Sequence, residues 1–129
     1  MNTPASLRST IESCRKCPRL VQYQGALKSV NPGYHCAPVA PWGVVRPRLL
    51  IVGLAPGLQG AGRTGKGFVG DASGAFLFSS LYEYGFSSSG DAEKARLQGA
   101  VITNIVKCLP PKNRPSGIEK RQCEGFLRQ

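Results

Sequence analysis

Four of the five cysteines have a spacing that is common in metal and iron–sulfur sites. Cys14 and Cys17 form a Cys-x2-Cys pair, and Cys108 and Cys123 lie far downstream. Thiolates two residues apart can hold one metal ion or one face of a cluster from a single turn of chain. An odd cysteine count without an export signal argues against disulfides. The pattern predicts a ligand site, and it leaves zinc, iron–sulfur and unligated thiols as alternatives.

A glycine-rich loop is the second place where chemistry is expected. Glycines recur from Gly53 to Gly74, directly after the apolar segment 48–54. In open α/β sheets ligands bind outside the carboxyl ends of strands, where glycine lets the backbone approach closely. Residues 60–66 fit the first part of a phosphate-loop pattern that would use Lys66, but Gly67 replaces its magnesium-binding Ser or Thr. The loop therefore predicts a ligand pocket other than a typical phosphate loop.

Three side chains could act on a ligand at this loop. Asn104 ends a second apolar segment, and a buried amide without a partner costs about 1–3 kcal/mol, so it indicates either ligand contact or a bond to loop backbone. Phe68 could stack on a flat ligand or belong to the core. Asp71 is the one acid in the loop. It could stabilise positive charge in a reaction, or it could cap the next helix.

The elements that must position these residues alternate between strand and helix. Two strands buried on both faces are predicted over residues 48–54 and 100–106, with a Pro- and Gly-rich connector before them. Helices are predicted over 6–14, 75–86 and 91–98, and from the capping box Ser116–Glu119 onward. This order favours a parallel sheet between helices, and such strands lie inside larger sheets. Residues 1–129 are therefore expected to form a single incomplete α/β domain.

The charge balance indicates a polyanionic partner. Seventeen Lys and Arg residues against seven Asp and Glu give a net charge of +10 in 129 residues. Nucleic acid is the commonest partner of such a surface. The cations expected either to face it or to form a plain solvated surface are Arg63, Lys66, Lys107, Lys112 and Arg114. Without a membrane span or a secretion signal, the chain is expected to be cytoplasmic, associated with the nucleoid and independent of membranes.

Four motifs in a fixed order make the sequence resemble the iron–sulfur branch of the uracil-DNA glycosylase superfamily. They are Gly-Leu-Ala-Pro-Gly at 53–57, Arg-Thr-Gly at 63–65, Phe-Val-Gly-Asp-Ala-Ser-Gly at 68–74 and Thr-Asn-Ile-Val-Lys-Cys at 103–108. Leu54 stands where family 4 has Glu, so the chain resembles family 5 more closely. The resemblance runs from Cys14 to Cys123.

The resemblance implies a fold, a reaction and a cofactor. The fold would be a three-layer αβα domain with a central parallel sheet whose C-terminal strands are missing here. The activity would be DNA repair: hydrolysis of the N-glycosidic bond of uracil, with other deaminated bases as further candidates, in double- or single-stranded DNA by a monomer. A structural 4Fe-4S cluster would be held by Cys14, Cys17, Cys108 and Cys123.

The resemblance also implies roles for the loop residues. Asp71 and Asn104 would be catalytic. The substrate would be bound by Gly53, Leu54, Ala55, Pro56, Gly57, Phe68 and Asn104.

Two features depart from the family pattern. The family's later His-Pro-Ser type motif does not occur in this sequence, and the one histidine, His35, is expected to be exposed or bonded locally. Cys36 lies outside the ligand pattern and is expected to be a small semi-buried hydrophobe. Weak or absent glycosylase activity is therefore expected for these 129 residues, and the alternative is a non-enzymatic zinc or iron–sulfur module that binds nucleic acid.

Overall fold

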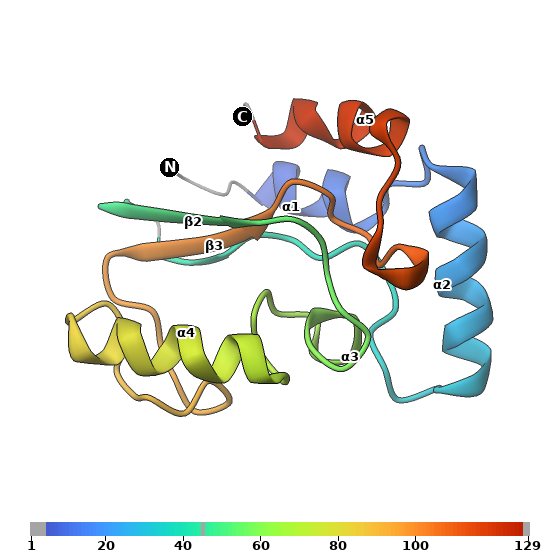
Figure 1. The fold of residues 1–129 in the computed structure, drawn as a ribbon. Helices are drawn as coiled ribbons and strands as arrows, with labels where there is room; N and C mark the ends of the chain where they lie inside the picture. The colour runs from blue at the N-terminus through green and yellow to red at the C-terminus, as the bar shows by residue number, and fades with distance from the viewer. Residues whose placement is uncertain (1–4, 45, 128–129) are drawn as a thin grey trace.

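A three-stranded sheet lies at the centre of the computed structural model, which describes residues 5–44 and 46–127 (Figure 1). The strands are β1 (Trp42–Gly43), β2 (Leu49–Gly53) and β3 (Ala100–Asn104), in the spatial order β1-β3-β2. β2 and β3 are parallel, and Gly53 pairs with Asn104 at their carboxyl ends. The α/β class and the parallel pair are confirmed, whereas antiparallel β1 lies in a segment predicted to be a connector.

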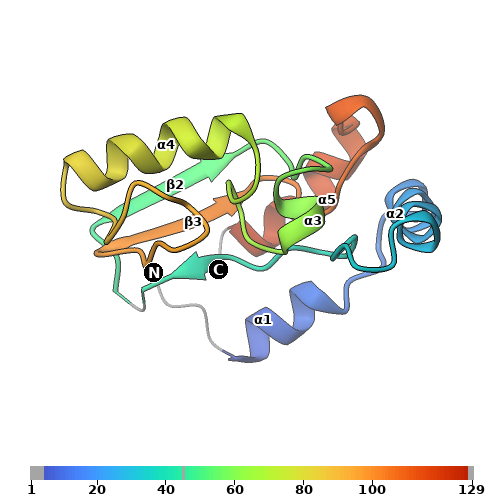
Figure 2. The ribbon, with the colours of Figure 1, turned by 90° about the horizontal axis from the view of Figure 1, so that it is seen from below.

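Helices lie on both sides of this sheet (Figures 1 and 2). α4 (Ala72–Glu83) packs Phe78 and Leu81 against Ile102 of β3. On the other side, α1 (Ala5–Glu12) and α5 (Gly117–Leu127) share a second core cluster. The capping box that opens α5 forms as predicted, with Ser116 and Glu119 bonded to each other's backbone N–H. None of the helices in the described part of the chain has the length and apolar character to cross a membrane.

The remaining elements differ from the prediction or lie within loops. α2 (Pro18–Val30) was not predicted, because Pro18 was interpreted as a helix terminator, although proline is favoured at the first position of a helix. Residues 91–98 form turns instead of a helix, and an isolated bridge pairs Ser87 with Leu97. The short α3 (Ala61–Thr64) lies within the glycine-rich loop, and a 3-10 turn, η1 (Pro111–Asn113), precedes α5.

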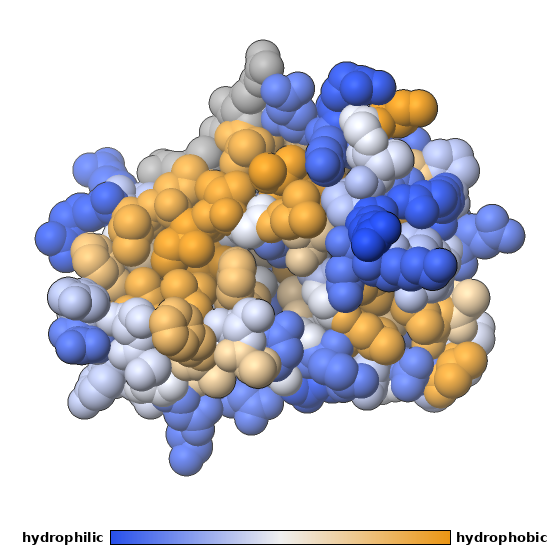
Figure 3. All heavy atoms as spheres, viewed as in Figure 1, coloured by the Kyte–Doolittle hydropathy of each residue, from blue (hydrophilic) through white to orange (hydrophobic). Residues whose placement is uncertain are grey.

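The prediction that both strands are buried on both faces is correct for β3 and wrong for β2. All five residues of β3 are buried. In β2, Leu50 and Val52 are 40% and 42% exposed, and Leu54 beyond the strand is 46% exposed. β2 is an edge strand, and these side chains point away from the α4 core, which takes Leu49 and Ile51. Figure 3 shows a hydrophobic patch where Figure 1 places this strand.

Candidate active site

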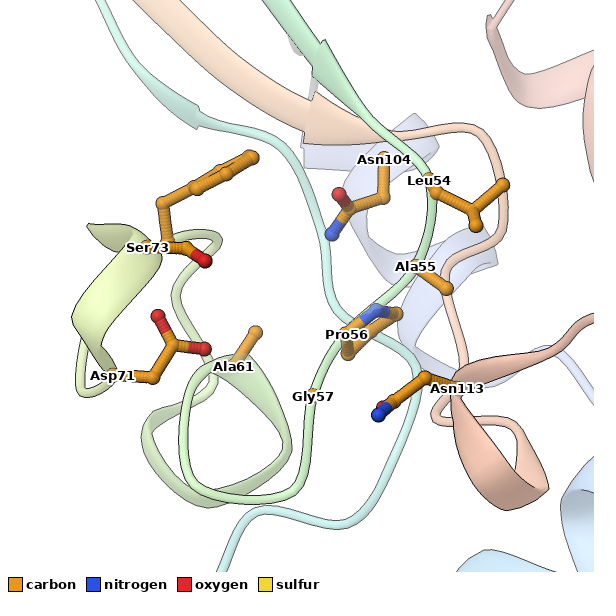
Figure 4. Close-up of a pocket in the computed structure, with 10 residues that line it drawn as sticks. Leu54, Ala55, Pro56, Gly57, Ala61, Asp71, Ser73, Asn104 and Asn113 are labelled. Atoms are coloured by element: carbon orange, nitrogen blue, oxygen red, sulfur yellow. The ribbon is translucent and has the colours of Figure 1, made fainter. Parts of the chain in front are cut away.

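A pocket of about 330 Å³ opens at the carboxyl ends of β2 and β3 (Figure 4). It is formed by the loop after β2, α3, the loop that leads into α4, the first turn of α4, the end of β3 and η1. Its lining residues are Leu54, Ala55, Pro56, Gly57, Ala61, Phe68, Asp71, Ser73, Asn104 and Asn113. All the residues predicted to meet a substrate therefore line one pocket, except Gly53.

Asn104 is a buried residue whose amide is open to the pocket. Its side chain forms no hydrogen bond with residues 5–44 or 46–127, and the residue is 5% exposed. Gly53 lies opposite it in register, and a methyl group there would come 2.3 Å from the Asn104 amide oxygen and 2.8 Å from the Phe68 ring. Gly53 thus acts as a spacer that lets both side chains approach β2. A buried amide without a protein partner is suited to bind a ligand.

Phe68 is held in an uncommon backbone conformation at the pocket. Its φ of 63° is left-handed, which costs about 1 kcal/mol or more for a residue with a Cβ. The flanking loop fixes it: the Trp42 indole donates to the Gly67 carbonyl at 3.0 Å, and the Thr64 hydroxyl donates to the Val69 carbonyl at 2.8 Å. A strained and firmly held aromatic residue in a pocket is typical of a functional site.

Asp71 caps a helix and also lines the pocket. It is the N-cap of α4, and one carboxylate oxygen accepts the Gly74 N–H at 3.0 Å. The other oxygen lies beside Gly60, where a methyl group would come within 2.4 Å of it. Figure 4 shows the carboxylate across the pocket from Asn104. The two roles proposed from the sequence are therefore compatible.

Three pocket residues were not predicted, and Lys66, which the phosphate-loop alternative needs, lies outside the pocket. Ala61, Ser73 and Asn113 line the pocket, although no motif assigned them a role. Lys66 does not line it, because its ammonium lies over the Trp42 ring, 5.2 Å from the centroid. The phosphate-loop alternative thus gains no support.

The four cysteines of the predicted ligand pattern lie within electrostatic range of one another. Cys17, Cys108 and Cys123 are buried and Cys14 is half-buried. Burial, followed by the neighbouring thiolates, raises the pKa of Cys108 to about 12. Burial also raises the pKa of Cys17 and Cys123, so these thiols hold their protons at neutral pH.

The surroundings of these thiols include a backbone donor and a buried lysine, but no ready metal-binding group among the described residues. No three His, Cys, Asp or Glu side chains in residues 5–44 and 46–127 are arranged to hold a single metal ion. The Lys107 backbone N–H donates to the Cys123 sulfur at 3.4 Å, a type of bond that tunes iron–sulfur sites. The Lys107 ammonium donates to the Asn104 carbonyl and is 2% exposed, and burial lowers its pKa. Lys107 therefore cannot belong to the exposed basic stripe that was considered from the sequence.

An ion pair joins α2, which begins directly after Cys17, to α5, which contains Cys123. Arg19 of α2 donates two hydrogen bonds to the Glu119 carboxylate of α5, at 2.6 and 2.8 Å. Arg19 also donates to the Arg114 carbonyl at 3.1 Å. The bonds from Arg19 to the carboxylate, together with the bonds between Ser116 and Glu119, lower the pKa of Glu119 to about 2. The loop between Cys108 and α5 is thus fixed by charge as well as by packing.

His35 forms a local hydrogen bond, as predicted, whereas Cys36 lines a hollow together with Cys14. The His35 imidazole bonds locally to the Pro38 carbonyl at 3.0 Å. Cys36 is 7% exposed, so it is somewhat more buried than expected, and burial raises its pKa.

Comparison with known proteins agrees with the resemblance in the sequence. The chain is 40% identical over 125 residues to a type-5 uracil-DNA glycosylase of Pyrobaculum aerophilum, covering 91% of this chain and 55% of that protein. It is 43% identical over 122 residues to the type-5 uracil-DNA glycosylase of Thermus thermophilus, covering 88% and 56%. A type-4 uracil-DNA glycosylase of Pyrobaculum aerophilum is 35% identical over 124 residues, covering 95% and 52%.

The chain spans about half the length of these curated relatives. The family model for the uracil DNA glycosylase superfamily matches residues 40–129, which include the loop, the pocket and two of the cysteines. The chain therefore belongs to the uracil DNA glycosylase superfamily.

Proposed function

We propose that this chain binds DNA containing uracil and serves in hydrolysis of the N-glycosidic bond of that nucleotide. The observation that carries the proposal is the unpartnered Asn104 amide facing Asp71 across a pocket that Phe68 also lines. A glycosylase must extrude the nucleotide, stack the base and read its Watson–Crick edge. These three residues supply an aromatic face, an edge reader and a carboxylate.

Each residue has a definite task in this reaction. The Asn104 amide would bond the uracil edge, and the Phe68 ring would stack on the base. As the bond to the base breaks, positive charge develops on the sugar, and the free oxygen of Asp71 would stabilise that charge or orient the attacking water. Backbone N–H groups of residues 54–57 would bind the departing base or the water.

The cofactor proposed for the cysteine group is a 4Fe-4S cluster. Cys14, Cys17, Cys108 and Cys123 would hold it, and the Lys107 N–H would bond the Cys123 sulfur. Its role would be structural, because it would join the segment between α1 and α2 to the loop that carries Asn113 and to α5.

The partner proposed for the chain follows from its charge. An excess of ten cations favours single- or double-stranded DNA, and exposed Lys112 and Arg114 lie in the loop beside the pocket. We propose that residues 1–129 form one domain of this kind, that it acts as a monomer and that it works in the cytoplasm on the nucleoid. Other deaminated bases stay candidates beside uracil.

A binding experiment tests the function independently of turnover. Single-stranded oligonucleotides with one deoxyuridine or one deoxycytidine differ only at the edge that Asn104 would read, and need no melting of a base pair. We expect tighter binding of the deoxyuridine strand, with the preference lost in Asn104→Ala and kept in the exposed-site control Asp91→Asn. Equal binding of both strands by the unaltered chain would contradict the proposal.

A single-turnover cleavage assay on the same deoxyuridine strand adds the catalytic arm. Any release of uracil should disappear in Asp71→Asn while binding persists. Cleavage that survives this substitution would remove Asp71 from the proposed mechanism.

A further inference from the structure

A buried lysine connects the pocket to the group of four cysteines. Lys107 is 2% exposed, and its ammonium donates a hydrogen bond to the backbone carbonyl of Asn104. Its main chain has two further partners: the N–H donates to the Cys123 sulfur at 3.4 Å, and the carbonyl accepts the Val39 N–H at 2.8 Å. Lys107 is therefore fixed both by its main chain and by its ammonium.

The ammonium satisfies a carbonyl that the sheet leaves open. In a planar trans peptide, the N–H and the preceding carbonyl point in opposite directions. The Ile105 N–H donates to the Gly53 carbonyl of β2 at 2.8 Å, so the Asn104 carbonyl points to the other side, toward β1. Antiparallel β1 pairs with residues 101–102, two positions short of Asn104. The Lys107 ammonium thus binds this carbonyl where a longer β1 would otherwise do so.

A buried lysine destabilises a fold unless its hydrogen bonds are needed. Burying a cation without a carboxylate costs free energy, and none of the ion pairs among residues 5–44 and 46–127 includes Lys107. Burial lowers the pKa of Lys107, and the Cys123 thiolate opposes this only in part. A methionine of similar length would fill the same space without burying a charge, but it cannot donate a hydrogen bond. The bond to the Asn104 carbonyl is therefore the contribution that is specific to lysine.

We infer, resting on the proposed function, that Lys107 is a positioning residue for recognition of the base. The Asn104 amide forms no hydrogen bond within residues 5–44 and 46–127, so its direction depends on the main chain that carries it. Pairing with Gly53 of β2 fixes that main chain on one side, and the Lys107 ammonium fixes it on the other. Figure 4 shows the amide at this end of β3. Binding groups need such supporting bonds, because small errors in their direction lose hydrogen bonds to the ligand.

Substitutions at Lys107 test the assignment through base preference. The probes are single-stranded oligonucleotides with one deoxyuridine or one deoxycytidine, and fluorescence anisotropy gives the affinity for each. Lys107→Met should lower the preference for deoxyuridine by about fivefold, the size of one hydrogen bond, and leave the affinity for the deoxycytidine strand unchanged. Lys107→Arg keeps a donor at this position and should keep the preference.

Val101→Ala is the matched control for lost stability. Val101 is 1% exposed and lies in β3, three residues before Asn104 and hence on the opposite face of the strand. Its truncation should lower the free energy of unfolding and leave the base preference unchanged. Circular dichroism verifies that each variant is folded at the temperature of the binding measurement. If Lys107→Met does not fold, Lys107→Gln takes its place: its neutral donor reaches less far and should give a partial loss of preference.

The outcomes separate this inference from the proposed function. A folded Lys107→Met, or in its place a folded Lys107→Gln, that keeps the full preference of the unaltered chain overturns the positioning role alone. Equal weakening of both strands overturns it as well, because Lys107 would then act on the fold and not on recognition of the base. Equal binding of both strands by the unaltered chain overturns the proposed function, and the positioning role falls with it.

Discussion

β2 and β3 are neighbouring parallel strands with similar apolar sequences, yet their burial differs. Every residue of β3 is buried, with Ala100 and Ile102 at 0% exposure, whereas alternate residues of β2 are about two-fifths exposed. β3 has a strand on each side and helices over both faces. β2 has one neighbour, and only its face toward α4 is covered by the described residues. A strand's place in the sheet, rather than its hydrophobicity, therefore decides how much of it is buried.

The largest expected difference between the strands is in core stability. Ile102→Ala should lower the free energy of unfolding by about 2–5 kcal/mol, because it leaves a cavity against α4. Leu50→Ala should lower it by less than about 1 kcal/mol, because that side chain is already partly in water. Urea unfolding followed by circular dichroism measures both. Equal losses would show that β2 is covered in solution.

The carboxyl ends of the two strands should be coupled through Gly53. Gly53→Ala should weaken binding of the deoxyuridine oligonucleotide by about tenfold, roughly 1.4 kcal/mol, because the new methyl group displaces the Asn104 amide and the Phe68 ring. Fluorescence anisotropy gives the affinity. Gly25→Ala in α2 is the control: nothing lies within 4 Å of a methyl group there, and alanine should stabilise the helix by about 0.5–1 kcal/mol.

A reciprocal exchange at one paired position compares the two environments directly. Val52 of β2 pairs with Thr103 of β3, whose hydroxyl is buried without a partner among the described residues. Thr103→Val should raise the free energy of unfolding by about 1 kcal/mol, because it removes this unsatisfied group. Val52→Thr should change it by less than about 0.5 kcal/mol. Destabilisation by Thr103→Val would mean that the hydroxyl finds a partner in solution.

The smallest effect on stability is expected at the β2 edge, where the effect on self-association of the protein should be the clearest. Val52→Lys places a charge on an exposed apolar strand, a device that natural edge strands use against aggregation. Light scattering of a concentrated solution should fall, while the free energy of unfolding stays within about 0.5 kcal/mol. Val30→Lys, at a residue of α2 that is 78% exposed, should leave scattering unchanged. Equal reductions in light scattering by Val52→Lys and Val30→Lys would show that the effect comes from net charge alone.

Local signals in the sequence predicted much of this fold. The capping box, the α4 helix and the strands β2 and β3 follow from patterns of a few residues each, and the parallel pairing follows from the order strand–helix–strand. α2 was missed because Pro18 can end one helix or begin another, and only the tertiary structure decides between these. β1 is two residues long and pairs with a strand that lies far along the chain, so no local pattern could identify it.

The candidate site likewise has residues that the sequence predicted and residues that it did not. The residues that the motifs singled out do lie around one pocket, although their roles stay predictions until they are tested. Ser73 and Asn113 were missed, because a serine at a helix start and an asparagine between prolines usually have local roles. The segment Pro-Pro-Lys-Asn-Arg-Pro, in which three residues lie between prolines, is a local signal that could have identified the η1 loop as restricted.

The bonds between Arg19 and Glu119 have a consequence for proton binding. Because the pKa of Glu119 is about 2 in the folded chain and is ordinarily 4.5, the unfolded chain takes up this proton first as the solution is acidified. The resulting stabilisation is complete above about pH 4.5 and declines as the pH falls toward 2. The junction of α2 and α5 should therefore lose this stabilisation over the same range of pH, and its loss should contribute to acid unfolding of the chain.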